Sequence, residues 1–305
     1  MREHGKDTEK RNASLHHFEN RYFERMANSL GDKARLLKYL PPVIEGAPAP
    51  RVLDVGAGGG EFAEHLRLAG YDVTALDASN DAIDRIREKF PKVTTAHFLA
   101  NHVDALGVDI FDAIICSSIL HEVFSYGDDI HKAGHLSSID RAFESFNKAL
   151  APGGVLIIRD GVLPDNWKDL GYITFGDNGN EKDLATYLDM CPFANGVSSK
   201  AGNLVKLHYV ARNTYIGNVR SLMEFAYTYT WGIQSYHRET QELYGVLTLD
   251  EYAAMLEKHG YTVTTKFSYL QPGYPEHLKD KLTLHVNGEV DNWFDSNAIW
   301  VANKK

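Results

Sequence analysis

The sequence predicts an α/β fold in which helices cover both faces of a doubly wound, mostly parallel sheet. Three observations support this prediction. Apolar strand patterns alternate with helical patterns between residues 51 and 160. Two of these strands, at 111–116 and 155–158, are nearly continuous apolar runs, as is typical of strands that are covered on both faces. The first strand ends in a cluster of glycines, which is typical of a turn that binds a nucleotide at the edge of such a sheet.

The expected elements follow one another in the order of a βα repeat. A helical pattern precedes them, because large apolar side chains recur at four-residue spacing from Phe18 to Leu30, and Pro41-Pro42 ends it. Strands are expected at 51–55, 72–77, 93–98, 111–116 and 155–158, and helices at 61–68, 80–90 and 138–150. Parallel strands joined in this way require right-handed crossovers.

The repeat breaks after Asp160 and resumes near Thr248. Residues 161–246 are rich in glycine, asparagine and aromatic side chains and show no βα alternation, so we expect them to form a mostly helical cap. Thr248 is a suitable N-cap and Gly260 a suitable terminator for one more helix. The last strands are expected at 261–269 and 297–302.

Composition and charge restrict the classes of function. The chain has 305 residues, of which 44% are hydrophobic and 24% charged, as is typical of a globular protein. Its net charge of −9 argues against nucleic-acid binding through a broad basic surface. The two cysteines, Cys116 and Cys191, argue against a disulfide framework. The first residues lack the apolar core of a signal peptide, and no apolar run reaches the roughly 20 residues of a membrane span. The expected location is therefore the cytoplasm, without a membrane partner.

The segment at 51–60 carries the most informative pattern in the chain. A strand that ends at Asp54 is followed by glycines at positions 56, 58 and 60 and then by a helical pattern. Glycine permits tight turns, positive φ and close approach of a ligand to the backbone, so this turn is expected to hold a nucleotide. A second acid, Asp77, ends the next strand, where it can accept hydrogen bonds from ribose hydroxyls.

The glycine spacing distinguishes between two kinds of nucleotide. A dinucleotide turn reads G-x-G-x-x-G and holds a pyrophosphate at the helix N-terminus. Here the pattern is D-x-G-x-G-x-G, and the carboxylate of Asp54 would repel a pyrophosphate. The pattern therefore disfavours a nicotinamide-dependent oxidoreductase and favours a ligand that has a cationic end and no phosphate.

This pattern resembles the first motif of class I S-adenosylmethionine-dependent methyltransferases. The segment at 146–158 is also similar to the one that precedes the fifth strand in that family. The resemblance covers about 51–160 and 247–305, and it implies a seven-stranded Rossmann-like sheet whose last strand inserts antiparallel between the fifth and the sixth. It also implies S-adenosylmethionine as cofactor, with the glycine loop under the methionine part and Asp77 on the ribose.

We expect four parts along the chain, of which the resemblance covers the second and the fourth. These are an N-terminal helical lid and linker at 1–50, a cofactor-binding core at 51–160, a cap insertion for the acceptor at 161–246 and the C-terminal part of the core sheet at 247–305. In the lid, Tyr22 or Phe23 is expected either to face the sulfonium through a cation–π contact or only to pack on the sheet.

The residues expected to bind the cofactor lie at the ends of four strands. They are Asp54, Gly56, Ala57, Gly58, Gly60, Asp77, Ala78, Asn101, His102, Cys116 and Ser117. Asn101 stands where the family usually has an acid that contacts the adenine amine. Cys116 is not expected to act as a nucleophile, because methyl transfer needs no covalent enzyme intermediate.

Candidate catalytic residues follow the fourth strand. His121 lies where many methyltransferases for small molecules carry a histidine, so the resemblance implies a general base, with Glu122 orienting it. The alternatives are that His121 only caps a helix or closes the pocket, and that Glu122 has a structural role. Tyr126, Arg159 and Asp160 are expected to line the acceptor site. Packing is the alternative for Tyr126, and a buried ion pair is the alternative for the other two.

The sequence as a whole predicts a methyltransferase that transfers a methyl group to an oxygen or nitrogen of a small-molecule acceptor by in-line displacement. Two alternatives stay open: an acceptor that is RNA or protein, and a protein that binds the cofactor without catalysis. No metal is expected, because His131 and His135, although four residues apart, are better explained as solvated side chains. The sequence indicates no oligomeric state.

Overall fold

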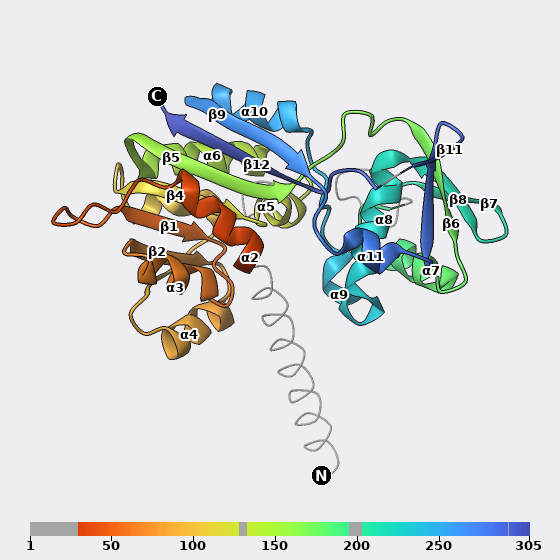
Figure 1. Cartoon of the computed structure of the whole chain (residues 1–305), viewed down its shortest axis with the longest axis horizontal. Helices are drawn as coiled ribbons and strands as arrows, with labels where there is room; N and C mark the ends of the chain where they lie inside the picture. The colour runs from red at the N-terminus through yellow and green to blue at the C-terminus, as the bar shows by residue number, and fades with distance from the viewer. Residues whose placement is uncertain (1–29, 128–132, 195–202, 292) are drawn as a thin grey trace, which may run out of the picture.

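The computed structural model of the chain describes residues 30–127, 133–194, 203–291 and 293–305. Two bodies of secondary structure lie side by side, a core around a large sheet and a cap around a smaller one (Figure 1). The carboxyl ends of the parallel core strands point toward the cap. Because open parallel sheets bind ligands at this edge, the cap faces the expected site.

The core sheet has seven strands, and its order confirms the predicted fold class. The strands are β1 (Arg51–Val55), β2 (Asp72–Asp77), β3 (Thr94–His97), β4 (Phe111–Ser117), β5 (Leu150–Gly161), β9 (Tyr261–Tyr269) and β12 (Asn297–Lys304). They lie in the order β3-β2-β1-β4-β5-β12-β9. The pairs among β1 to β5 are parallel, whereas β12 runs antiparallel to both β5 and β9. The last strand thus inserts between the fifth and the sixth, as the resemblance implied.

Both faces of this sheet are buried, which explains the continuous apolar strands. In β4, Ile114 belongs to one hydrophobic cluster and Ile115 to another, and in β5 Leu156 and Ile157 divide in the same way. Successive side chains of a strand point to opposite faces, so helices must cover both sides.

The core helices begin where the sequence supplies capping groups. They are α3 (Glu61–Leu68), α4 (Asn80–Lys89), η2 (Ala100–Leu106), α5 (Leu120–Tyr126), α6 (Ser137–Ala149) and α10 (Leu249–Lys258). At α4, the Ser79 hydroxyl accepts a hydrogen bond from the backbone N–H of Ala82. At α10, Thr248 and Glu251 form a reciprocal capping box.

The described chain begins in α2 (Leu30–Lys33), which continues as the 3₁₀ helix η1 (Ala34–Tyr39). Leu36 of η1 is fully buried in the same hydrophobic cluster as Ile115 of the core sheet. The lid residues Tyr22 and Phe23 lie outside the described residues.

The cap contains a second sheet that the sequence analysis did not predict. Its strands are β6 (Leu170–Phe175), β7 (Leu207–Ala211), β8 (Thr214–Asn218), β10 (Leu282–Val286) and β11 (Glu289–Asp291), in the antiparallel order β11-β10-β6-β8-β7. Its helices are α7 (Glu181–Met190), α8 (Val219–Trp231), η3 (Ile233–Ser235), α9 (Tyr236–Glu239) and α11 (Tyr274–Leu278). The helices agree with the predicted helical cap, and the sheet is an addition to it.

Because of this second sheet, part of the segment 247–305 belongs to the cap and not to the core sheet. Leu282 of β10 lies opposite Phe175 of β6, although the two residues are far apart in the sequence. The C-terminal part of the chain was expected to form only core sheet, but the segment between β9 and β12 leaves the core and joins the cap (Figure 1). Strand pairing over such a distance depends on tertiary packing, and local patterns do not reveal it.

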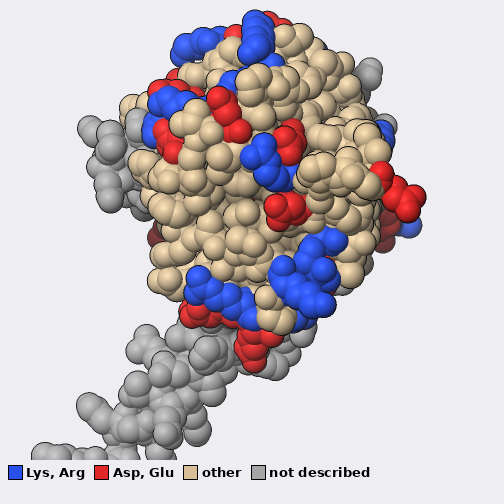
Figure 2. Space-filling view, turned by 90° about the vertical axis from the view of Figure 1, so that its left-hand side faces the viewer, with Lys and Arg blue, Asp and Glu red and all other residues tan. Residues whose placement is uncertain are grey.

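The end of the core that faces away from the cap carries charges of both signs. Figure 2 shows Lys and Arg side chains lying beside Asp and Glu side chains on this face. Across the described ranges, no helix combines the length and the apolar character that a bilayer crossing requires.

Candidate active site

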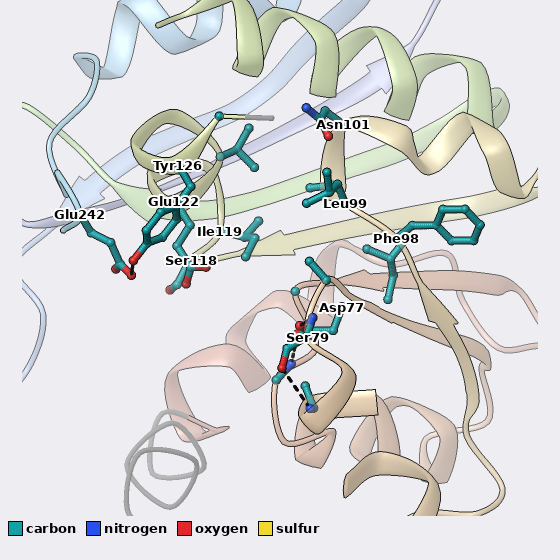
Figure 3. Close-up of a pocket in the computed structure, with 18 of the residues that line it drawn as sticks. Asp77, Ser79, Phe98, Leu99, Asn101, Ser118, Ile119, Glu122, Tyr126 and Glu242 are labelled. Atoms are coloured by element: carbon teal, nitrogen blue, oxygen red, sulfur yellow. Dashed lines mark hydrogen bonds between the residues drawn. The ribbon is translucent and has the colours of Figure 1, made fainter. Parts of the chain in front are cut away.

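A cavity of about 320 Å³ lies at the carboxyl edge of the core sheet (Figure 3). The turns that follow β1, β2 and β4 line it, and η2 contributes Asn101. The cap adds Arg238 and Glu242. The cavity therefore occupies the crevice at which open α/β sheets bind nucleotides.

The turn between β1 and α3 requires glycine. Gly56 has a φ of 71° and Gly60 a φ of 83°, in the left-handed region that residues with a Cβ rarely adopt. A Cβ on Gly56 would lie 2.7 Å from Cδ1 of Ile119, and a Cβ on Gly60 would lie 2.6 Å from Cγ1 of Ile86. The turn packs against these two side chains and leaves Gly56 and Gly58 in the cavity wall.

Asp77 holds this turn from the neighbouring strand. One of its carboxylate oxygens accepts a hydrogen bond from the backbone N–H of Gly58 at 2.8 Å, and the other accepts one from the N–H of Ser79 at 2.9 Å. Figure 3 shows Asp77 and Ser79 together at the cavity, away from Tyr126 and Glu122. Because each carboxylate oxygen has two lone pairs, Asp77 can also accept hydrogen bonds from the hydroxyl groups of a ligand.

Asp54 lies behind the cavity wall. It is 2% exposed, and its Oδ2 has no hydrogen-bond partner among the described residues. Burial raises the pKa of Asp54 to about 6; the charge of Lys33 opposes this shift and that of Asp77 adds to it. A buried carboxylate of this kind favours a cationic group nearby and disfavours a phosphate. The site therefore fits a nucleoside with a cationic end.

The predicted cofactor residues divide into two groups. Those that line the cavity are Gly56, Gly58, Asp77, Ala78 and Asn101. Those that are not among its lining residues are Asp54, Ala57, Gly60, His102, Cys116 and Ser117. Cys116, for example, is fully buried in the core, and burial raises the pKa of its thiol well above the ordinary value, which is unsuitable for a nucleophile.

Several lining residues were missed by the sequence analysis. They include Ser79, Phe98, Leu99, Ser118, Ile119, Val123, Arg238 and Glu242. Ser79, Phe98 and Ser118 lie within two residues of a strand end, so their positions could have suggested them. Arg238 and Glu242 come from the cap, and no local pattern connects them with the glycine turn.

A second cavity, of about 260 Å³, adjoins the first. Ser118, Glu122 and Glu242 line both cavities. Ser118 has a φ of 59°, which is strained for a residue other than glycine, and strain of this kind is concentrated at functional sites. The carboxyl end of β5 contributes Arg159 and Asp160 to the second cavity.

His121 lies in the wall of the second cavity and is held by Asp160. Its Nδ1 lies 2.7 Å from Oδ1 of Asp160, and its Nε2 lies 3.5 Å from Oε2 of Glu242. Burial favours the neutral imidazole, but the two carboxylates raise the pKa of His121 well above its ordinary value. Burial also disfavours the charged form of Asp160, but His121 and backbone N–H groups keep the pKa of Asp160 below its ordinary value. The pair is therefore an imidazolium beside a carboxylate at neutral pH.

Asp160, not Glu122, is the carboxylate that orients His121. Consecutive residues on a helix point in different directions, so Glu122 faces the junction of the two cavities instead. Burial and the neighbouring Glu242 raise the pKa of Glu122 to about 8, while His121 opposes this shift. The Tyr126 hydroxyl donates a hydrogen bond to Oε1 of Glu242 at 2.8 Å, and Figure 3 shows these side chains close together.

Arg159 and Asp160 do not form an ion pair with each other, which corrects one of the two expectations for them. The Nε of Arg159 donates to Oδ2 of Asp32 at 2.7 Å and to the Tyr269 hydroxyl oxygen at 3.0 Å. Its Nη1 donates to Oγ of Ser118 at 2.7 Å. Consecutive residues of a strand point to opposite faces, so the partners of the two charges come from opposite sides of the sheet.

The junction of the cavities has a geometry that could accommodate a cation. Ligand atoms of His121, Glu122 and Glu242 lie within 4.8 Å of one another. The histidines considered in the sequence analysis are not part of this group: His131 lies outside the described residues, and His135 is exposed.

Comparisons with known proteins agree with this geometry. The family described as "Methyltransferase domain" matches residues 18–266, which is more than half of the chain. An uncharacterized methyltransferase from Synechocystis sp. is 31% identical over 40% of this chain and 51% of its own length. A ubiquinone biosynthesis O-methyltransferase from Aromatoleum aromaticum is 35% identical over 43% of this chain and 59% of its own length. The chain thus spans between half and three fifths of these curated relatives.

The fold is also similar to that of a solved protein. An S-adenosylmethionine dependent methyltransferase from Mesorhizobium loti superposes with a TM-score of 0.50 over 89% of this chain and 96% of that chain, at 16% identity. The sheet order, the glycine turn and the family match lead to the same conclusion. The chain belongs to the class I S-adenosylmethionine-dependent methyltransferases, and S-adenosylmethionine is its cofactor.

Proposed function

We propose that this methyltransferase transfers the methyl group to an oxygen or nitrogen of a small-molecule acceptor that occupies the second cavity. The observation that supports this proposal is the wall that the cavities share. Ser118, Glu122 and Glu242 line both, so an acceptor in the second cavity lies next to a cofactor in the first. A volume of about 260 Å³ suits a small molecule better than a polymer chain.

We assign the first cavity to the cofactor in the following way. Gly56 and Gly58 let the backbone approach the methionine part, since neither carries a Cβ. Asp77 accepts hydrogen bonds from the ribose hydroxyls. Asn101, which is 2% exposed, contacts the adenine. Asp54 contributes from behind the turn, as a negative charge that favours the cationic end of the cofactor.

The bound cofactor supplies a methyl group that is already activated on its sulfonium, so the protein mainly has to align the acceptor and exclude water. The Arg159–Asp32 pair and the His121–Asp160 pair fix the polar wall of the second cavity in one arrangement. A fixed wall of this kind lets the acceptor bind without reorganisation of the protein.

His121 is the proposed general base. Asp160 fixes its orientation through Nδ1 and leaves Nε2 on the side of Glu242. Because the neighbouring carboxylates raise the pKa of His121, the neutral form that accepts a proton becomes populated only toward alkaline pH. We therefore expect turnover to rise with pH through the pKa of this pair. The ubiquinone biosynthesis O-methyltransferase from Aromatoleum aromaticum supports an oxygen acceptor as one of the two choices.

Calorimetry with the purified chain tests this proposal in its first step. S-adenosylmethionine and S-adenosylhomocysteine should bind with micromolar affinity, and NADH should not. Isotope-labelled S-adenosylmethionine, incubated with pooled small metabolites, should then produce labelled small molecules detectable by mass spectrometry. Label that appears only in RNA or protein would refute the small-molecule acceptor, and the absence of all label would favour a protein that binds the cofactor without catalysis.

A further inference from the structure

The wall of the second cavity contains more carboxylates than its cations neutralise. Four acids line it: Glu122, Asp160, Glu239 and Glu242. Asp160 has a charged partner in hydrogen-bond contact, because His121 lies 2.7 Å away. The same imidazole lies 3.5 Å from Glu242, so one positive charge serves two carboxylates. The other donors to these acids are neutral: backbone N–H groups of Ile119, Leu120 and Gly161 donate to Asp160, and the Tyr126 hydroxyl donates to Glu242.

Among the described residues, no cation forms an ion pair or hydrogen bond with Glu239 or Glu122. Glu239 is 3% exposed and accepts a short hydrogen bond from the Tyr244 hydroxyl. The positive charges that act on Glu239 are His121, which already serves two other carboxylates, and Arg238, whose side chain lines the first cavity. In the described part of the chain, no hydrogen bond or ion pair to Glu122 is present, although this side chain lies in the wall between the cavities.

The other cations in the cavity wall are engaged elsewhere. Arg159 lies 2.5 Å from Oδ2 of Asp32. Lys33 interacts with Asp54 and Glu61, behind the first cavity.

Without a cation in contact, burial raises the pKa of Glu122 to about 8 and that of Glu239 to about 7, so both acids hold a proton over part of the neutral range. A bound cation favours their ionised form, so the cluster can supply negative charge to a cationic ligand.

Aromatic rings complete the wall. Tyr227, Trp231, Tyr244 and Tyr274 line the same cavity. The ring centroids of Tyr227 and Tyr274 are 4.9 Å apart, and the Tyr227 hydroxyl donates to the carbonyl of Phe294 at 2.8 Å, which fixes the ring. Aromatic faces attract cations, and carboxylates attract them more strongly. A phenolate or carboxylate ligand would meet repulsion from the same groups.

We propose that the acceptor is a small cationic amine and that its ammonium group binds at the junction of the cavities, between Glu122, Glu239 and Glu242 and the aromatic wall. This inference rests on the proposed function, because it assigns the acceptor class of the same site. Glu122 and Glu242 also line the first cavity, so an ammonium held by them lies beside the cofactor. The cavity volume of about 260 Å³ restricts the amine to a small molecule.

The reaction balances with groups that are present. The ammonium gives one proton to the neutral form of His121, the proposed base. Its freed lone pair forms the nitrogen–carbon bond while the carbon–sulfur bond breaks and leaves its electron pair on sulfur. The product is a methylated ammonium, and the proton on His121 passes to solvent. The carboxylates bind substrate and product alike, since both carry the positive charge.

Calorimetry on the full chain saturated with S-adenosylhomocysteine tests the inference. The probes are phenethylamine, its neutral analogue 3-phenyl-1-propanol and its anionic analogue 3-phenylpropanoate. We expect the amine to bind at least about tenfold more tightly than either analogue, because a charge-assisted contact contributes that much. The change Glu239→Gln should remove most of this preference while S-adenosylhomocysteine still binds, because Glu239 lines the second cavity and not the first. The matched control is Glu144→Gln on the exposed face of α6, which should change neither affinity.

The outcomes separate the two proposals. Failure of S-adenosylhomocysteine to bind would contradict the proposed function itself. Normal binding of S-adenosylhomocysteine with equal affinity for the three probes, or with no affinity for the amine, would overturn only the amine assignment. A parallel titration with MgCl₂ and ZnCl₂ tests whether His121, Glu122 and Glu242 bind a metal ion instead of an ammonium group. Tight metal binding that excludes phenethylamine would also overturn the assignment, because the carboxylates would then be metal ligands.

Discussion

The buried carboxylate of Asp54 should destabilise the cofactor-free protein at neutral pH. Burial raises its pKa from 3.8 to about 6 in the folded chain. The carboxyl is therefore easier to ionise in the unfolded chain, and its ionisation above pH 4 progressively favours unfolding. Each pKa unit corresponds to about 1.4 kcal/mol, so the full cost above pH 6 is about 3 kcal/mol. At pH 5 the same two pKa values give about half of this cost.

The change Asp54→Asn removes this ionisation and keeps the shape of the side chain. We expect the variant to be more stable than the natural chain by about 3 kcal/mol at pH 7.5 and by about half of that at pH 5. Urea unfolding at the two pH values, without cofactor, measures the difference. Asp72→Asn, on the exposed side of β2, is the matched control and should show no such change. A loss of stability in Asp54→Asn, or a gain that does not depend on pH, would refute the reasoning.

Three further predictions concern the two cavities. Asp77→Ala should weaken S-adenosylhomocysteine binding by about 1.5–3 kcal/mol in calorimetry, because it removes charge-assisted hydrogen bonds, and unchanged affinity would contradict the ribose assignment. His121→Ala should lower turnover at least about 10²-fold at its optimal pH, and near-normal turnover with an unchanged pH profile would exclude the base role. Asp160→Asn should lower the pKa of His121 toward its ordinary value, because the change removes the main negative charge that raises this pKa. NMR titration of the imidazole measures the pKa, and an unchanged value would show that Glu242 alone raises it.

The core could be predicted from the sequence because its signals are local. The glycine turn follows directly on a strand pattern, the acid at the end of β2 ends the next one, and the caps Ser79 and Thr248 each bond a residue three positions further on. Parallel strands that are buried on both faces carry a continuous apolar pattern, which identifies them without any knowledge of their partners. The antiparallel place of β12 came from the family resemblance and not from a local pattern.

The second cavity could be predicted only in part. His121 and Asp160 were both named, but their mutual contact was not, because they are 39 residues apart and meet only through the pairing of β4 with β5. The alternation of side chains along a strand could have shown that Arg159 and Asp160 point to opposite faces. No local sequence pattern indicates Glu239 and Glu242, because the packing of the cap against the core places them in the cavity wall.

The core and the cap contribute different parts of the site. The matches to the Synechocystis and Aromatoleum proteins cover 40% and 43% of this chain, which is far less than the core and the cap together. The cap contributes two of the four acids and the aromatic rings of the second cavity, where we propose that the acceptor binds: Tyr227 and Trp231 from α8, Glu239 from α9, Glu242 and Tyr244 from the segment after it, and Tyr274 from α11. A methyltransferase can therefore keep its cofactor chemistry while the cap changes the charge of the acceptor cavity. In this chain the cap brings two of the three carboxylates assigned to the ammonium. We therefore expect Glu239→Gln to alter which molecule is methylated while cofactor binding stays unchanged, because Glu239 lines the second cavity and not the first.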